Sequence, residues 1–121
     1  MRLTIIESPY AGDIERHIFY ARRAMRHSLL LGEAPYASHL LYTQPRVLRD
    51  NVPHEREMGL ARGHWFIRAF GNAYTTCYLD AMLAVYTDYG ISGGMRAGID
   101  CATKYSLPIV YRKIGLNGEG E

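Results

Sequence analysis

Cysteine is scarce in this sequence, which has only Cys77 and Cys101 among its 121 residues, without CxxC spacing. Two isolated cysteines exclude a disulfide framework and provide no zinc-ligand pattern, so we expect two reduced structural thiols, no metal site and no cofactor. Long apolar runs are also lacking. None approaches the roughly 20 residues that are needed to cross a bilayer, which excludes a transmembrane helix.

Net charge is low as well, because 14 Lys and Arg residues are balanced by 12 Asp and Glu residues. The resulting charge of +2 is too small to indicate a nucleic-acid-binding surface. Arg22, Arg23 and Arg26 cluster late in a predicted helix, where cations complement the helix dipole. Residues 1–7 lack the apolar core of a signal peptide. We therefore predict a cytoplasmic protein with no nucleic-acid partner and no membrane partner.

Length and composition predict one globular domain. A chain of 121 residues can bury about two thirds of its unfolded surface, and its 48% apolar residues are typical of a folded protein. We predict a single domain over residues 1–116, followed by a flexible tail over residues 117–121.

Apolar periodicity predicts strands that alternate with helices. From Ile14 onward apolar residues recur at helical spacing behind Asp13, a good N-cap. Residues 81–86 are instead continuously apolar, as in a central parallel strand. This alternation is typical of a three-layer α/β fold with a mostly parallel sheet. The predicted elements are strands at residues 3–7, 34–39, 81–86 and 108–111 and helices at residues 13–31, 54–72 and 93–105.

The predicted helix at residues 54–72 is interrupted by Gly59 and Gly63, which permit a close approach of another element. We expect Met58, Ala61 and Trp65 to form its buried stripe, with Trp65 in the core or in a subunit interface. Residues 40–53, which precede it, form a long excursion over the edge of the sheet. Loops of this length in compact domains are often lids or binding loops.

Two short loops each join a predicted strand to a predicted helix. The first is Glu7-Ser-Pro-Tyr-Ala-Gly-Asp13 and the second is Asp88-Tyr-Gly-Ile-Ser-Gly-Gly-Met95. In a parallel sheet both lie outside the carboxyl ends of the strands, where backbone N–H groups and helix N-termini bind ligands. The pair therefore predicts one small-molecule site that is divided between two loops.

The second loop has the residues of an anion or sugar cradle. Gly90, Gly93 and Gly94 free the backbone to approach a ligand. Ser92 caps the following helix and offers a hydroxyl group. An ordinary glycine-rich turn is the alternative for this loop. Asp88 is placed either to bind ribose hydroxyl groups or to form an Asx turn.

Side chains from the first loop and from the second strand extend this site. Tyr10 is placed to stack on a base, with plain packing as the alternative. Ser38 and His39 end the second predicted strand at the same edge, where His39 contacts phosphate, acts as an acid or is structural. The predicted ligand-binding residues are Ser8, Pro9, Tyr10, Ala11, Gly12, Asp13, Ser38, His39, Asp88, Gly90, Ile91, Ser92, Gly93, Gly94 and Met95.

These segments together resemble the nucleoside 2-deoxyribosyltransferase-like superfamily in order and spacing over nearly the whole chain. The resemblance is carried by Ile5-Ile-Glu-Ser-Pro-Tyr10, a strand that precedes Asp88, Gly94-Met-Arg-Ala-Gly-Ile-Asp-Cys-Ala102 and Leu107-Pro-Ile-Val110. It implies a flavodoxin/Rossmann-like sheet of about four to five strands that binds a nucleoside or nucleotide. It also implies a homodimer or a higher homo-oligomer.

The loop sequences are further similar to small proteins that are common in actinobacteria and their phages. This similarity implies a bacterial or phage-infected host cell as the setting.

The sequence departs from that superfamily at Gly98. Active members carry a glutamate at this helix position, which attacks the anomeric carbon and forms a covalent glycosyl-enzyme. Asp100 lies two residues further on and is turned by roughly 200° away from the site. Glu7 and Asp88 are the candidate carboxylates if the protein is an enzyme that acts on water.

Three functions follow from these observations. The first is a binder of a nucleotide or an ADP-ribose-like small molecule without turnover, as a sensor or a sequestering sponge, with a phage anti-defence role. The second is an N-glycoside hydrolase or deoxyribosyltransferase with a relocated carboxylate. The third is a structural or interaction protein that uses only the fold.

Overall fold

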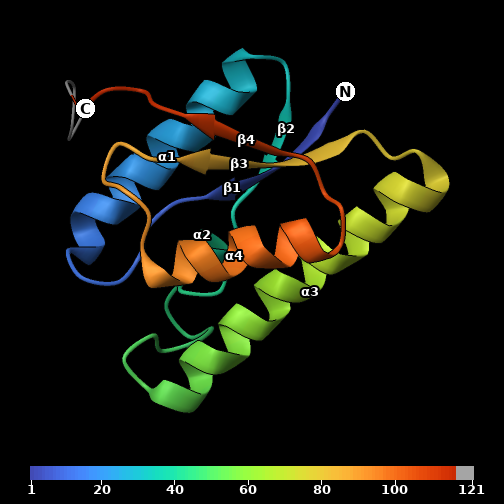
Figure 1. Cartoon of the computed structure of the whole chain (residues 1–121). Helices are drawn as coiled ribbons and strands as arrows, with labels where there is room; N and C mark the ends of the chain where they lie inside the picture. The colour runs from blue at the N-terminus through green and yellow to red at the C-terminus, as the bar shows by residue number, and fades with distance from the viewer. Residues whose placement is uncertain (117–121) are drawn as a thin grey trace.

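The fold is a parallel sheet with helices on both of its faces (Figure 1). The structure, a computed structural model, describes residues 1–116; the tail that was predicted over residues 117–121 lies outside the described residues. The strand order is β2-β1-β3-β4 and all neighbouring pairs are parallel, which confirms the predicted α/β class. The elements are β1 (Leu3–Glu7), α1 (Ile14–Leu30), β2 (Ala34–Tyr36), α2 (Ser38–Leu41), α3 (Pro53–Cys77), β3 (Ala81–Tyr86), α4 (Gly93–Lys104) and β4 (Ile109–Arg112).

The two central strands, β1 and β3, supply the core on both faces of the sheet. Side chains alternate along a strand, so successive residues of β1 face opposite layers. Ile5 packs with Ile67 of α3 and Met95 of α4, whereas Ile6 packs with Tyr20 of α1. This alternation sends Glu7 toward the α3 and α4 layer and Ser8 toward the opposite side.

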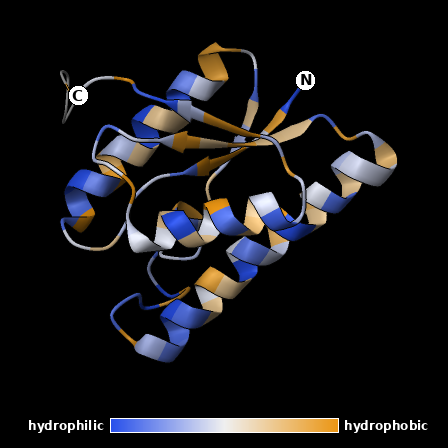
Figure 2. Cartoon of the chain, in the orientation of Figure 1, coloured by the Kyte–Doolittle hydropathy of each residue, from blue (hydrophilic) through white to orange (hydrophobic). Residues whose placement is uncertain are grey.

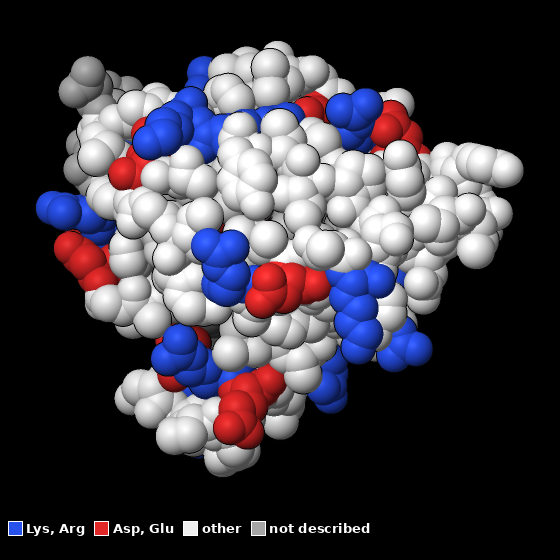
Figure 3. Space-filling view, viewed as in Figure 1, with Lys and Arg blue, Asp and Glu red and all other residues white. Residues whose placement is uncertain are grey.

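Hydropathy follows this layered arrangement. Apolar residues concentrate on the strands, while the helices carry hydrophilic residues on their outer sides (Figure 2). Basic and acidic side chains are interspersed over the face shown in Figure 3. Within residues 1–116, no helix has the length and apolar character to cross a membrane.

Helix α1 begins where the sequence predicts it, because the Asp13 carboxylate accepts a hydrogen bond from the Arg16 backbone N–H at 3.3 Å. Its buried face consists of Tyr20, Ala21, Ala24 and Ser28. Ile14, which opened the predicted apolar stripe, is 41% exposed because the first turn extends past the sheet.

Helix α3 is longer than predicted and faces differently. Met58, Ala61 and Trp65 are exposed, so the prediction that they form the buried stripe is wrong. The buried residues are Ile67 and Gly71, because only the later turns of α3 pack on the sheet.

The glycines of α3 do allow close packing. A Cβ atom at Gly71 would lie 2.5 Å from the Tyr105 carbonyl oxygen, and one at Gly63 would lie 2.9 Å from Ser38 Oγ. Both contacts are too short for a real side chain, so these two positions bring α3 against the neighbouring segments.

The second strand ends earlier than predicted. Strand β2 stops at Tyr36, and Ser38 and His39 lie in α2, a single helical turn, rather than at the end of a strand. The short β2 pairs with only three residues of β1. The chain then turns away from the sheet through residues 42–52 before α3 begins.

A largely buried ion pair joins the two edge regions of the sheet across the α1 side. Both Arg112 Nη atoms donate to the Glu33 carboxylate, at 2.6 and 2.9 Å. Ser28 Oγ donates to the same carboxylate at 2.6 Å, and Arg112 also donates to the Tyr86 hydroxyl at 3.1 Å. The hydrogen bonds from Arg112 lower the pKa of Glu33 to about 2.

Arg112→Met should therefore lower the free energy of unfolding by about 3–5 kcal/mol, because it leaves the Glu33 carboxylate buried without its partner. Urea unfolding at neutral pH measures this change. Arg2→Met is the matched control, because Arg2 and Asp80 form a pair with both side chains about half exposed. Its cost should stay below about 1 kcal/mol.

Acid should also remove the contribution of the pair between Glu33 and Arg112 to the free energy of unfolding. The pKa of Glu33 is lower in the folded protein, so the stabilisation is complete above about pH 4.5 and is lost as the pH falls toward 2. Equal unfolding free energies for the wild type and Arg112→Met at neutral pH would contradict the role of this pair.

Candidate functional site

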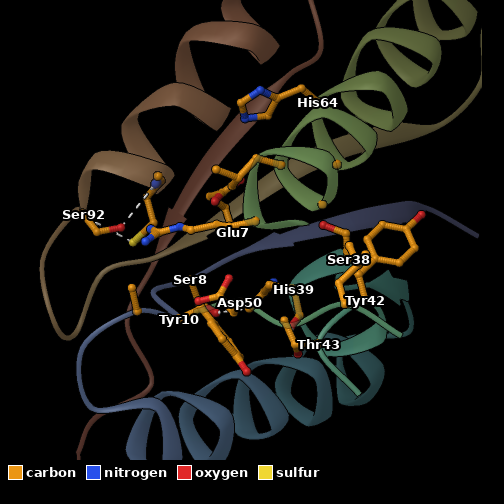
Figure 4. A pocket seen from close by; sticks show the side chains of 18 of the residues that line it. Glu7, Ser8, Tyr10, Ser38, His39, Tyr42, Thr43, Asp50, His64 and Ser92 are labelled. Atoms are coloured by element: carbon orange, nitrogen blue, oxygen red, sulfur yellow. Dashed lines mark hydrogen bonds between the residues drawn. The ribbon is translucent and has the colours of Figure 1, made fainter. Parts of the chain in front are cut away.

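A cavity of about 310 Å³ opens at the carboxyl end of β1, between α2, α3 and the start of α4 (Figure 4). Its position is the edge of the sheet at which parallel α/β proteins bind ligands. The described residues that line it are Ile5, Ile6, Glu7, Ser8, Tyr10, Ala11, Ser38, His39, Tyr42, Thr43, Leu48, Asp50, Glu55, Arg56, Gly59, Leu60, Gly63, His64, Ile67, Ser92, Gly93, Gly94 and Met95.

The structure brings the two predicted loops together at this cavity. The first loop contributes Glu7, Ser8, Tyr10 and Ala11, and the second contributes residues 92–95. Ser38 and His39 also line it, although they come from α2. The loops converge because β1 and β3 are paired in parallel, so that both strands end at one edge.

The remaining predicted site residues lie outside this cavity. They are Pro9, Gly12, Asp13, Asp88, Gly90 and Ile91. Asp13 serves as the N-cap of α1, and Gly12 and Gly90 adopt positive φ angles of 94° and 81° in their turns.

The Asp88 carboxylate is engaged in hydrogen bonds within the fold and does not face the cavity. It accepts hydrogen bonds from the Tyr20 hydroxyl at 2.6 Å, from Ile114 N–H at 2.9 Å and from Gly115 N–H at 2.8 Å. Burial alone would raise the pKa of Asp88, but these hydrogen bonds outweigh it and hold the pKa below the ordinary value. With these donors in place, Asp88 ties the segment after β4 to the end of β3.

Glu7, unlike Asp88, accepts no hydrogen bond from residues 1–116. It is the last residue of β1, and strand alternation directs its side chain to the helix layer, against Gly98 of α4. A Cβ atom at Gly98 would overlap Glu7 Oε2 and would lie 2.8 Å from Glu7 Cδ. The absence of a side chain at position 98 thus leaves the space that the Glu7 carboxyl group fills.

No residue within 1–116 gives Glu7 a hydrogen bond or an ion pair. Removal from water without such a partner disfavours the charged form of a carboxyl group. Burial accordingly raises the pKa of Glu7 to about 8. A strongly perturbed acid in a cavity is a candidate functional group.

Ser8 and His39 form a hydrogen-bonded pair on the other side of β1, as Figure 4 shows. Ser8 Oγ and His39 Nε2 are 2.8 Å apart. Burial lowers the pKa of His39 to about 4, so its imidazole is neutral at physiological pH. The Tyr10 ring meets the His39 ring edge-on, with centroids 6.4 Å apart. The pair offers the cavity a neutral donor and acceptor.

The start of α4 provides backbone N–H groups. Ser92 Oγ accepts a hydrogen bond from Met95 N–H at 3.3 Å, so the predicted cap is confirmed and the hydroxyl is engaged. A Cβ atom at Gly93 or Gly94 would meet no atom within 4 Å. The glycines therefore leave open space beside the first amides of the helix.

The sequence predicted an excursion over this edge at residues 40–53, but it named none of the individual residues in the outer wall of the cavity. Tyr42, Thr43, Leu48 and Asp50 come from the excursion after α2, and the remaining wall residues come from the first turns of α3. The length of the 40–53 segment was the only signal for this wall.

An ion pair fixes the excursion to α3. Arg49 donates to the Glu55 carboxylate at 2.9 and 2.7 Å, and hydrogen bonds from Arg49 lower the pKa of Glu55. As for metal binding, residues 1–116 contain no group of three or more His, Cys, Asp or Glu side chains placed to hold an ion.

The pH dependence of stability should reveal Glu7. The unfolded chain ionises Glu7 near pH 4.5, whereas the folded protein keeps the proton up to about pH 8, so stability falls as the pH rises through this range. His39 and His64 have lowered pKa values in the folded protein, and their titration in the unfolded chain, centred near pH 6.5, opposes this fall only slightly above that pH. Between pH 6.5 and 8 the free energy of unfolding should fall by about 2 kcal/mol in the wild type and stay nearly constant in Glu7→Gln.

Glu57→Gln is the control for this measurement, because Glu57 is exposed and lies outside the cavity. It should retain the fall. An identical fall in Glu7→Gln would show that Glu7 is already ionised in the folded protein.

Gly98→Ala should reveal the contact with Glu7 through a double-mutant cycle. Alanine in a helix is favoured over glycine by about 1 kcal/mol, but in the wild-type background the methyl group displaces the Glu7 carboxyl group and cancels this gain. In a Glu7→Ala background the gain should appear in full. Urea unfolding of the four proteins measures the coupling, and additive changes would mean that the two residues do not share this space.

A family model described as a domain of unknown function, DUF7768, matches residues 2–112 of the chain. The matched range includes all four strands and every residue that lines the cavity. Comparison with curated proteins and with solved structures gives no match.

Proposed function

The chain belongs to the DUF7768 family, and from the chemistry of its cavity we propose that it binds a nucleotide or an ADP-ribose-like small molecule. It holds this molecule without turnover. The observation that carries the proposal is the convergence of Ser8, Tyr10, His39 and the open start of α4 on one cavity at the carboxyl edge of the sheet. A volume of about 310 Å³ lies within the range of small-molecule sites.

Retention without turnover is supported by the helix position at which the resembled superfamily carries its nucleophile. Gly98 has no side chain, and Asp100 is exposed. The resemblance to small phage and actinobacterial proteins supports a sensor or sponge that removes a nucleotide signal in the cytoplasm of an infected bacterium. In that setting tight binding by itself has an effect, because sequestration lowers the free concentration of the signal.

The proposal includes self-association, which the same resemblance implies. Met58, Leu60 and Trp65 leave α3 with exposed apolar side chains, and Trp65 is 59% exposed. Light scattering from the purified protein measures the mass, and a monomer at micromolar concentration would contradict this part.

A second candidate function is favoured by one observation, the unpartnered Glu7 carboxyl group in the cavity. In an N-glycoside hydrolase or a deoxyribosyltransferase, the Glu7 carboxylate at the end of β1 would serve as the base or nucleophile in place of a carboxylate on α4. This enzyme would release a free base, and Glu7→Gln would abolish the release.

The deciding experiment incubates the purified protein with nucleosides, nucleotides, deoxynucleotides and ADP-ribose derivatives, then identifies bound and cleaved compounds by mass spectrometry. An intact compound that is released only on denaturation would support the binder. Free base would support the hydrolase. If neither a bound compound nor a free base is found, the proposal is overturned. A structural or interaction protein is then the remaining function.

Gly94→Trp should test the position of the site. Its indole would enter the open space beside the start of α4, so the affinity for the retained compound should fall at least about tenfold. Ala97→Trp is the matched control, because Ala97 is exposed on the same helix and lies outside the cavity. Equal affinities for both variants would place the site elsewhere.

A further inference from the structure

The Glu7 carboxyl group lines the cavity, and no residue within 1–116 gives it a hydrogen bond or an ion pair. We infer, on the basis of the proposed function, that Glu7 is the specificity-determining acid of the site: it accepts hydrogen bonds from neutral hydroxyl or amino groups of a nucleoside moiety and leaves any phosphate at the mouth.

The position of Glu7 supports a role toward a ligand rather than toward the fold. The end of β1 and the bare backbone at Gly98 hold its side chain in place, yet neither carboxyl oxygen has a partner among residues 1–116. Buried carboxyl groups that serve the fold are normally paired, as Glu33 is with Arg112. An unpaired one lowers stability, and binding of hydrogen-bond donors offsets that cost.

The other ionisable groups around Glu7 do not neutralise it. They come from every element that packs near this end of β1, and none of them has a hydrogen bond to its carboxyl group. These groups are Cys101 of α4, His64, Arg56 and Glu55 of α3, His39 of α2, Tyr42 and Asp50 of the excursion and Tyr10 of the first loop. Glu55 is already paired with Arg49.

The distribution of charge explains why phosphate stays outside. Arg56 is the sole Arg or Lys among the described lining residues, and it is exposed in the first turn of α3. A phosphate group beside Glu7 would lie next to an acid, which Coulomb repulsion disfavours once Glu7 is ionised. The neutral part of a nucleotide is therefore favoured beside Glu7, and the phosphate is favoured near Arg56.

Entry of the neutral moiety changes the protonation of Glu7. In the empty cavity burial keeps the acid mostly protonated at pH 7. Hydrogen bonds from ligand hydroxyl or amino groups stabilise the carboxylate, so the proton passes to the solvent and affinity increases as the pH rises toward 8. Close to one proton should leave for each ligand that binds at pH 7.

Isothermal titration calorimetry tests the inference. The probes are the four ribonucleosides, their 5′-monophosphates, ADP-ribose, ribose 5-phosphate and inorganic phosphate, titrated at pH 7 into the wild type, Glu7→Gln and the surface control Glu57→Gln. Two buffers of different ionisation enthalpy give the number of protons released. The near-isosteric Glu7→Gln keeps the cavity filled and removes a buried acid, so it is expected to fold.

The expected result is that at least one base-containing probe binds the wild type and Glu57→Gln with proton release, and binds Glu7→Gln at least about tenfold more weakly and without proton release. Inorganic phosphate and ribose 5-phosphate should show no dependence on Glu7. Equal affinities for the wild type and Glu7→Gln, or binding without proton release, would overturn this inference and leave the proposed function standing. No binding by any probe would instead overturn the proposed function, and the inference with it.

Discussion

The parallel pairing of β1 with β3 is the constraint on which the rest of the molecule depends. Five consecutive residue pairs, from Leu3 with Ala81 to Glu7 with Val85, align the two strands so that they end at one edge. The loops that follow them must then meet, and the start of α4 is brought to the end of β1. Alternation along β1 divides its last side chains between the two layers. The cavity exists because of this register.

Two partly buried glutamates show how one fold gives the same chemical group two different environments. Glu33 receives hydrogen bonds from Arg112 and Ser28, and these hold its pKa near 2. Glu7 receives none within residues 1–116, and burial raises its pKa to about 8. The first acid stabilises the fold at neutral pH, whereas the second destabilises it. A cost of this kind at the edge where α/β sheets bind ligands is the physical argument for a role in binding.

The cavity combines this acid with neutral groups. Ser8 and His39 share a hydrogen bond, and the first amides of α4 face open space. Helix α3 and the excursion complete the enclosure, held by the ion pair between Arg49 and Glu55.

Local sequence determined the elements whose signals are short in range. Strands β1 and β3, helix α1 with its Asp13 cap and helix α4 with its Ser92 cap follow from apolar runs, periodicity and capping, and all of these act within a few residues. Tertiary structure alone decided where β2 ends, which face of α3 is buried and which residues form the outer wall of the cavity. It also decided that the Tyr20 hydroxyl donates a hydrogen bond to the Asp88 carboxylate. Each of these depends on partners that are distant in the chain, and apolar periodicity contains no information about them. The contact of the Glu7 carboxyl group with Gly98 is the clearest case. These residues are 91 positions apart, and they meet only because β1 and α4 pack together.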